Sequence, residues 1–417
     1  MNKENTDRIL GYKCVGCDEE YPVDPFQYQC PKCKSNLDVQ YNYKLIKEIW
    51  SVDDLKQFPY QSLWRYHPLL PVENPPDNLS MQSGGTPLIS FPNLLTDIGK
   101  IDLYIKDDTR NPSGSLKDRA TEVGIRHADE LGKNTIVAAS TGNAAASLAA
   151  LAAYYEKKAV ILAPTSAPPA KLTQILQYGA VLYPVDGTYD DAFDLSILVA
   201  EANGWYSRST GINPVLAEGK KTVGLEIAEQ LNWQVPNKIF VPTGDGCIIA
   251  GIYKAFLDLV RLGWISKLPQ LIAVQAEGSP AIVNALNSGK PMVPVQSNTI
   301  ADSISVDQPR DGEKAIIAVQ KTKGFGITVT DDEILVAQSR LARNTGVFAE
   351  PAAAASFAGF LKAMKRGTIH AGDSIVILAS GTGLKDIPAA QEKIEIPKAQ
   401  PATLEGFLTF YNENKKK

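Results

Sequence analysis

The sequence predicts an α/β fold with a doubly wound parallel sheet, preceded by a small module that contains four cysteines. Between residues 103 and 378, apolar runs of strand length alternate with segments whose apolar residues recur at helical spacing. Loops of small and polar residues follow several of these strands, at the edge where such sheets bind ligands. Two Cys-x-x-Cys pairs lie near the N-terminus, before this alternation begins. Ligand chemistry is therefore expected in the loops and metal chemistry in the N-terminal module.

The composition is that of a soluble enzyme with an ample hydrophobic core. The chain has 417 residues, of which 44% are hydrophobic and 21% charged, and this length suggests two or three domains. A net charge of −4 argues against nucleic acid as the main partner. We find no signal peptide, and no stretch approaches about 18 uninterrupted apolar residues, so no membrane span is expected. Five cysteines do not suggest a disulfide scaffold in a chain this long, and we expect a cytoplasmic protein.

The N-terminal module holds a candidate metal site. Cys14, Cys17, Cys30 and Cys33 form two Cys-x-x-Cys pairs, a spacing that lets four thiolates bind one tetrahedral zinc ion. Four protein ligands leave no open coordination position, so the zinc would be structural. The alternatives are two redox-active pairs or two disulfides, which a cytoplasmic setting makes less favourable.

The segment that follows shows little regular pattern. Residues 38 to 80 are expected to be irregular and to form an arm that leads into the main body. Gly84-Gly85-Thr86-Pro87-Leu88 then gives a turn signal just before the first strand of that body.

The stretch Asn111 to Arg119 joins a predicted strand, Leu103 to Lys106, to a predicted helix, Ala120 to Leu131. Lys117 therefore falls in the first turn of a helix, where the partial positive charge of the helix end disfavours a cation. Its pKa is expected to be lowered, which makes the amine a better nucleophile. The alternative is a loop lysine that binds an anion or extends into solvent.

The alternation continues to the end of the main body. Further strands are predicted at Asn134 to Ala139, Lys158 to Ala163, Val181 to Val185, Lys238 to Pro242, Leu271 to Ala276, Gly326 to Thr330 and Ser374 to Leu378. Further helices are predicted at Ala144 to Tyr155, Pro169 to Tyr178, Tyr189 to Asn203, Ile248 to Leu262, Asp331 to Thr345 and Ala352 to Met364. Strands separated by helices indicate parallel pairing, with ligands at the carboxyl ends of the strands.

Two of the loops at strand ends suit anions. The loop from Ser140 to Asn143 opens onto a helix N-terminus and could bind a carboxylate, although an ordinary helix cap is the alternative. The loop from Thr243 to Cys247 carries glycines that would let backbone amides converge on a phosphate. A dinucleotide-binding turn is the alternative there, but no complete G-x-G-x-x-G is present. Cys247 is expected to be a packed small side chain rather than a nucleophile.

The string NPSGSLKDR resembles the cofactor-lysine segment of the fold-type II pyridoxal-phosphate (PLP) enzymes, and within them the threonine synthase family, which has N-P-T-G-S-F-K-D-R there. The turn at residues 84–88, the loop at 140–143, the loop at 243–247 and the strand end at 380–386 resemble family segments in the same order. The resemblance implies that Lys117 forms the Schiff base with PLP and then acts as the general base of the reaction.

The resemblance also implies roles for the loops. Ser140, Thr141 and Gly142 would bind the substrate's α-carboxylate, and Asn143 would bond the phenolic oxygen of PLP. Gly244, Asp245, Gly246, Cys247 and Ile248 would hold the PLP phosphate. Asp245 departs from the family pattern, and its carboxylate is expected to point away from the phosphate. Ser380 would face the pyridine nitrogen, and a neutral hydroxyl there favours elimination and replacement chemistry over transamination.

The substrate-binding segment departs from the family. Threonine synthases commonly carry N-P-[YF]-R-x-E-G-Q-K-T, whose arginine helps to bind the substrate's phosphate, whereas this chain has Leu216 at that position. An aliphatic side chain cannot replace a bidentate phosphate ligand. Lys220, which replaces the glutamine, could supply the charge. Ser115, Lys171, Asn213 and Arg208 are further candidates.

The family further implies an architecture and a reaction. The expected parts are a zinc-ribbon-like module (1–44), a large PLP-binding domain (45–134 and 216–395), a small mobile domain (135–215) and a C-terminal extension (396–417) that ends in a disordered basic tail. Homodimers are usual in the family.

The favoured function is conversion of O-phospho-L-homoserine and water to L-threonine and phosphate. The alternatives are a sister enzyme, such as a cysteate-synthase-like enzyme on O-phosphoserine or a threonine/serine dehydratase, and a non-catalytic PLP-binding protein. The three histidines lie outside these loops, which argues against a Ser-His-Asp hydrolase.

Overall fold

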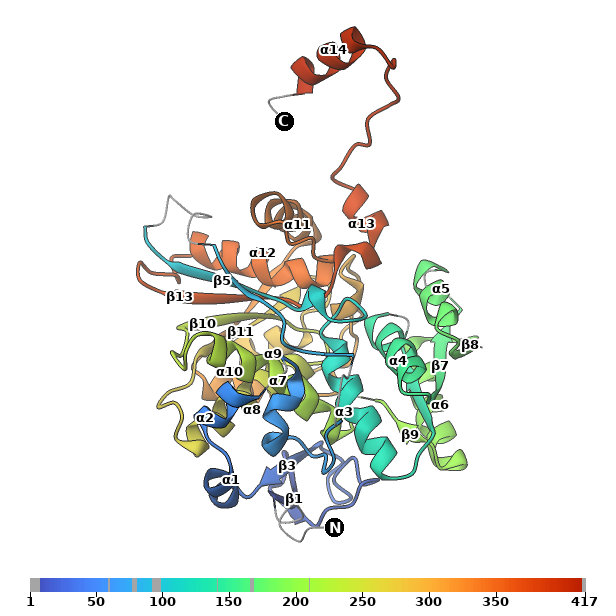
Figure 1. The fold of residues 1–417 in the computed structure, drawn as a ribbon, viewed down its shortest axis with the longest axis vertical. Coiled ribbons are helices and arrows are strands. Elements are labelled where there is room, and N and C mark those ends of the chain that lie inside the picture. The colour runs from blue at the N-terminus through green and yellow to red at the C-terminus, as the bar shows by residue number, and fades with distance from the viewer. Residues whose placement is uncertain are drawn as a thin grey trace.

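The computed structural model describes residues 8–58, 61–76, 81–91, 99–140, 142–165, 169–209 and 211–414. In these ranges the strands form three sheets, which confirms the predicted α/β class with a small N-terminal module (Figure 1). The module lies beside the large sheet's helices, and the smaller parallel sheet lies on the other side of helix α3 (Lys117–Glu130). No described helix has both the length and the hydropathy that a membrane span requires.

The largest sheet has six strands in the order β12-β11-β10-β13-β5-β4. Its strands are β4 (Leu88–Ser90), β5 (Asp102–Asp107), β10 (Lys238–Pro242), β11 (Gln270–Ala276), β12 (Phe325–Val329) and β13 (Ser374–Ala379). Every pair in the sheet is parallel except β4 with β5, which is antiparallel. The parallel pairing predicted from the strand and helix alternation is therefore confirmed.

Both faces of this sheet are covered by helices, which explains why its strands are nearly continuous apolar runs. In β13, Ile375 and Ile377 belong to the core beneath α11 and α12, whereas Val376 and Leu378 belong to the core beneath α8 and α10. Successive side chains of a strand point to opposite faces, so one apolar run supplies both cores. The covering helices include α7 (Pro214–Gln230), α8 (Cys247–Leu262), α9 (Ala281–Ser288), α10 (Gly312–Lys321), α11 (Asp331–Thr345) and α12 (Pro351–Lys365).

The second parallel sheet has the order β8-β7-β6-β9. Its strands are β6 (Thr135–Ala139), β7 (Lys158–Pro164), β8 (Val181–Val185) and β9 (Tyr206–Ser207), and its helices are α4 (Asn143–Tyr154), α5 (Pro169–Gln177) and α6 (Tyr189–Asn203). The predicted strands and helices of this region match these bounds within one residue.

Helices α7, α9 and α10 are absent from the predicted elements, and α7 is the longest helix described. It packs against both α3 and α8, and its residues from Pro214 to Ala228 are all buried. A helix that is buried all round has no polar face, so its sequence lacks the apolar stripe that reveals a surface helix. Several of its buried charges are instead neutralised by ion pairs, as when Lys221 bonds both Glu218 (2.5 Å) and Asp258 (2.8 Å).

The N-terminal module is an antiparallel sheet in the order β2-β1-β3, made of β1 (Ile9–Cys14), β2 (Glu20–Tyr21) and β3 (Leu37–Tyr41). The prediction that residues 38–80 are irregular is wrong in part. Helices α1 (Tyr43–Ile49) and α2 (Val52–Gln57) and the 3₁₀ segment Leu63–Leu69 lie there. Asn42 caps α1, and Ser51 with Asp54 forms a capping box on α2, so the start signals were present but the helices are too short to show periodicity.

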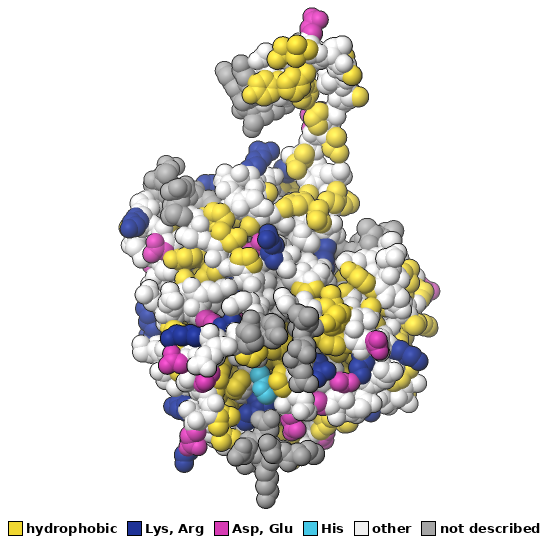
Figure 2. All heavy atoms as spheres, viewed as in Figure 1, with side chains coloured by type: hydrophobic (Ala, Val, Ile, Leu, Met, Phe, Trp, Pro, Cys, Tyr) yellow, Lys and Arg dark blue, Asp and Glu magenta, His cyan; other side chains and the backbone are white. Residues whose placement is uncertain are grey.

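The C-terminal segment leaves the body as an exposed arm. After α13 (Ile387–Gln391), the chain runs outward to α14 (Leu404–Asn414), which stands apart from the rest of the molecule in Figure 1. Its apolar side chains Leu404, Phe407 and Tyr411 are exposed, and Figure 2 shows apolar atoms over this helix. The predicted extension therefore carries an unpredicted helix, while the expected disordered tail, Lys415 to Lys417, lies outside the described residues.

Candidate active site

A cavity of about 370 Å³ lies at the carboxyl ends of strands from both parallel sheets. Ser140 follows β6, Thr243 follows β10 and Ser380 follows β13, and all three line this cavity. Ends of parallel strands are where ligands bind in open α/β sheets. The three loops that the sequence singled out therefore meet at one place, although they are far apart in the chain.

Lys117 is the first residue of α3, and its half-buried side chain lines the cavity. Burial lowers the pKa of its amine to about 8, and the nearby cations Lys220 and Arg208 act in the same direction. At pH 7 roughly a tenth of such amines are neutral, far more than for a lysine in water. The lowering predicted from the helix end is present, but burial is its largest cause.

The loop before Lys117 is held by contacts that fix the start of α3. Ser113 donates to the Asp118 carboxylate through its backbone N–H (2.6 Å) and its hydroxyl (2.5 Å). The Leu116 N–H donates to the Ser380 carbonyl (2.9 Å), and Gly114, with φ +81°, adopts a backbone that favours glycine. The lysine loop and the end of β13 therefore form one connected unit.

The loop at 140–143 presents Ser140, Gly142 and Asn143 to the cavity, while Thr141 lies outside the described residues. The Ser140 hydroxyl accepts the Gly142 N–H (3.2 Å), and Asn143 begins α4. The Asn143 amide donates to Glu350 Oε1 (2.7 Å) and Ser303 Oγ (3.2 Å). The positive end of α4 thus faces the cavity, as a carboxylate-binding loop requires.

The loop between β10 and α8 also lines the cavity, with Gly244, Asp245, Gly246, Cys247 and Ile248. Gly246 has φ +95° and precedes the first residue of α8, so N–H groups of the helix end point into the loop. The Asp245 carboxylate accepts the Arg310 N–H (3.2 Å), and burial raises the pKa of this carboxyl. Burial also raises the pKa of the Cys247 thiol to about 12, which agrees with a packed side chain rather than a nucleophile.

Two buried cations besides Lys117 line the cavity. Lys220 and Arg208 are both buried and line it, and burial lowers the pKa of Arg208 to about 10 and also lowers that of Lys220. Lys220 forms no ion pair within the described part of the chain. Beside them, the buried Ser209 hydroxyl lines the cavity and has no hydrogen-bonding partner among the described residues. Two buried cations and an unsatisfied hydroxyl suit a phosphate.

Three residues discussed as possible substrate ligands or at the motif's arginine position lie outside the cavity lining: Asn213, Ser115 and Leu216. Asn213 caps α7, with its carbonyl oxygen accepting the Val215 N–H (3.1 Å) and its amide donating to the Ser207 carbonyl (3.0 Å). Ser115 is fully buried beside the strand end, outside the cavity lining. Leu216 packs toward α3, where it fills the space above Gly124. The arginine position of the family motif therefore does not face this cavity.

Several residues at the site were not predicted. Glu350 lies on the cavity wall next to Asn143, and Arg310 bonds Asp190 of α6 (2.5 Å) across the cavity's edge. Neither Glu350 nor Asp190 belongs to a recognisable motif. Only the N-cap position of Glu350 before Pro351 marked it as the start of a helix.

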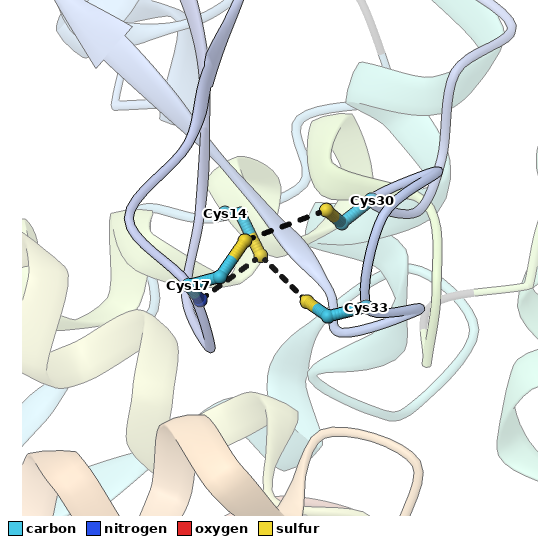
Figure 3. Close-up of side chains that lie close together, drawn as sticks. All are labelled: Cys14, Cys17, Cys30 and Cys33. Carbon is cyan, nitrogen blue, oxygen red and sulfur yellow. Dashed lines mark hydrogen bonds between the residues drawn. The ribbon is translucent and has the colours of Figure 1, made fainter.

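The four cysteines of the N-terminal module converge, as Figure 3 shows. Their sulfur atoms all lie within 4.8 Å of one another, with Cys14 to Cys33 at 3.3 Å and Cys17 to Cys30 at 3.7 Å. Four sulfurs around one zinc at about 2.3 Å would lie about 3.8 Å apart. The geometry fits one tetrahedral metal ion, and the cysteines form no disulfide.

Comparison with known proteins bears directly on this site. The family model described as pyridoxal-phosphate dependent enzyme matches residues 79–381, which is more than half of the chain. The threonine synthase of Methanocaldococcus jannaschii is 39% identical over 388 residues, covering 92% of this chain and 95% of that protein. The threonine synthase of Methanosarcina acetivorans is 39% identical over 398 residues, covering 95% and 97%.

The solved structures support the fold independently. The processed form of threonine deaminase isoform 2 from Solanum lycopersicum superposes with a TM-score of 0.63 at 23% identity, covering 74% of this chain and 86% of that one. At this identity the likeness concerns the fold alone. Taken with the lysine loop and the strand-end cavity, the sequence matches show that the chain belongs to the pyridoxal-phosphate-dependent enzymes and, within them, to the threonine synthase family.

Proposed function

We propose that this protein converts O-phospho-L-homoserine and water to L-threonine and phosphate. The observation that carries the proposal is a cavity in which the Lys117 amine faces two buried cations, in a chain 39% identical to threonine synthases over almost its whole length. An amine with a lowered pKa suits proton transfer, and the cations suit a substrate that carries a phosphate.

The residues around Lys117 fit the cofactor. The lysine amine, the α8 end with Gly244, Gly246 and Cys247, and the Ser380 hydroxyl lie around one cavity, as a ring with a phosphate on one side requires. When bound, PLP withdraws electrons from the amino acid and makes its carbon-bound protons acidic. Lys117 Nζ would bind the cofactor, and once released by the substrate amine would take and return protons at the substrate's carbon atoms.

The remaining wall would orient the substrate. Ser140, Gly142 and the α4 helix end would bind its carboxylate, and Lys220, Arg208 and Ser209 its phosphate. Arg208 donates to the Lys117 carbonyl (3.2 Å) and to Thr121 Oγ1 (2.8 Å), so its guanidinium is held close to the start of α3. In this proposal Lys220 binds the substrate's phosphate, which in other family members is bound by an arginine at the position of Leu216.

Release of threonine and phosphate in equal amounts from O-phospho-L-homoserine is the direct test. The PLP-loaded protein is expected to release both, and Lys220→Gln is expected to raise KM by about 10- to 100-fold, because a charged hydrogen bond to phosphate is lost. The change in kcat should be small, and Lys220→Arg should keep KM within about threefold of the wild type because it keeps the charge.

The possible failures have different meanings. A yellow protein that is inert on this substrate would contradict threonine synthesis but not PLP binding, and O-phosphoserine with sulfite, then L-threonine alone, would be tried. If Lys220→Gln weakens PLP binding and leaves KM unchanged, Lys220 serves the cofactor rather than the substrate.

We further propose that Cys14, Cys17, Cys30 and Cys33 bind one structural zinc ion, supported by the sulfur distances. Metal analysis of protein purified under reducing conditions is expected to give about one zinc per chain. Cys33→Ser should lower this content strongly, since it removes a ligand. Cys247→Ser, which changes the one cysteine outside the cluster, should leave the zinc content unchanged. Equal zinc loss in both variants would contradict the assignment.

We also propose that residues 135–215 form a domain that closes over the cavity in a homodimeric, cytoplasmic enzyme. The Asp190–Arg310 ion pair supports the closure because it joins α6 to the segment beside the Asp245 loop.

The dimer follows from the family resemblance, and light scattering of the purified protein would test it. No disulfide links the cysteines of the described residues, which fits a reducing compartment, and cell fractionation would test the location.

A further inference from the structure

Asn36 lies just after the second cysteine pair, and its side chain reaches out of the N-terminal module. Its Nδ2 atom donates toward the carbonyls of Gly211 (2.8 Å) and Arg310 (2.9 Å) and toward Asp311 Oδ1 (2.8 Å). Its own backbone is fixed in the module, because its carbonyl accepts the Val15 N–H (3.1 Å) between the first two cysteines. The residue therefore joins the cysteine module to two segments that border the cavity.

The segment that Asn36 holds is itself bonded to the loop between β10 and α8. The Asp311 N–H donates to the Asp245 carbonyl (3.0 Å), and the Arg310 N–H donates to the Asp245 carboxylate (3.2 Å). A Cβ atom on Gly246 would lie 2.7 Å from the Asp311 carbonyl oxygen, so the two segments are in close contact. A shift of residues 310–311 must therefore move the loop.

A primary amide suits these contacts. A primary amide carries two hydrogens, which here serve three acceptors, and it brings no charge beside Asp311. Asp311 is buried, and its second carboxylate oxygen already has no partner among the described residues. Without Asn36, two carbonyls and a carboxylate would lose their donor, which is unfavourable in a buried setting.

We infer that Asn36 is a positioning residue for the cofactor-phosphate loop: it holds residues 310–311 against Asp245 and Gly246, so that the cysteine module fixes the geometry of the loop. The inference rests on the proposed assignment of residues 244–248 to the PLP phosphate. It gives the N-terminal module a part in cofactor binding, although none of the module's described residues, 8–44, lines the cavity.

The test compares PLP with pyridoxal, which has the same ring and aldehyde but no phosphate. Full-length protein freed of cofactor is titrated with each, and binding is followed by absorbance. Asn36→Ala is expected to weaken PLP binding about tenfold, the effect of losing one or two hydrogen bonds, and to leave pyridoxal binding within about twofold. Asn36→Asp should weaken PLP binding further, since it cannot donate and places a second carboxylate beside Asp311.

Asn42→Ala is the matched control, because Asn42 caps α1 in the same region but does not touch residues 310–311. It should leave both affinities unchanged, and zinc content should be equal in the wild type and all variants. Equal weakening of PLP and pyridoxal by Asn36→Ala, or no weakening, would overturn the inference while the cofactor site stands. A wild-type protein that binds PLP no better than pyridoxal would overturn the phosphate-loop assignment and the inference together.

Discussion

Lys117→Ala is expected to abolish the yellow colour of the PLP-loaded protein and to lower threonine formation by about 10³-fold or more. The variant loses the amine that would bind the cofactor and also the base that would move protons, and a positioned base alone contributes about 10²- to 10⁴-fold. The structure gives no substitute, because the other cavity lysine among the described residues, Lys220, is already assigned to phosphate. Absorbance spectra and the threonine assay check both losses.

The control for Lys117 is an exposed lysine far from the cavity. Lys267→Ala should keep the colour and the activity of the wild type. A Lys117→Ala protein that still turned yellow and produced threonine at more than about a tenth of the normal rate would show that another amine carries the cofactor.

Arg119→Met is expected to lower the free energy of unfolding by about 3–5 kcal/mol, the usual cost of removing one partner of a buried ion pair. Arg119 is fully buried and bonds Asp108 (2.8 Å) and Glu226 (2.6 Å). Lys106 also bonds Glu226 (2.7 Å), so the substitution leaves Asp108 without its cation and Glu226 with only one. Urea unfolding of the PLP-free proteins, followed by far-UV circular dichroism, measures the loss.

Arg126→Met on the same helix is the matched control. Arg126 pairs with Asp129 (3.3 Å) at partly exposed positions, so its removal should change the free energy of unfolding by no more than about 1 kcal/mol. If the two variants are equally stable, the buried network around Arg119 does not hold α3, β5 and α7 together.

The parts of the fold that could be predicted from the sequence are those where local pattern and final environment agree. The strands β5 to β8 and β10 to β13 are apolar runs separated by helices, so their parallel pairing followed from order alone, whereas the two-residue strand β9 was not predicted. Helices α1 and α2 are too short for periodicity, and α7 is buried on every side, so each lacks the pattern that a longer surface helix shows. Propensity and periodicity are local properties, and these three helices depend on their neighbours.

The residues of the candidate site likewise fall into those that the sequence indicated and those that it did not. Lys117, Asn143 and the Gly244–Gly246 turn stand at strand ends or helix starts, where the sequence carries recognisable signals. Arg310 and Asn36 carry none, since their importance lies in contacts between segments far apart in the chain. At Leu216 the sequence already showed a departure from the family motif, and Lys220, the substitute named from the sequence, lines the cavity.

The family motif has arginine at the position of Leu216 and glutamine at the position of Lys220, so this chain carries its positive charge one helical turn further on. Residues four apart on a helix lie about 6 Å apart along its axis, and on nearly the same side. Leu216 nevertheless packs against Gly124 of α3, whereas the longer Lys220 side chain lines the cavity. One helical turn therefore separates a packing position from a position whose charge can reach a ligand in the cavity.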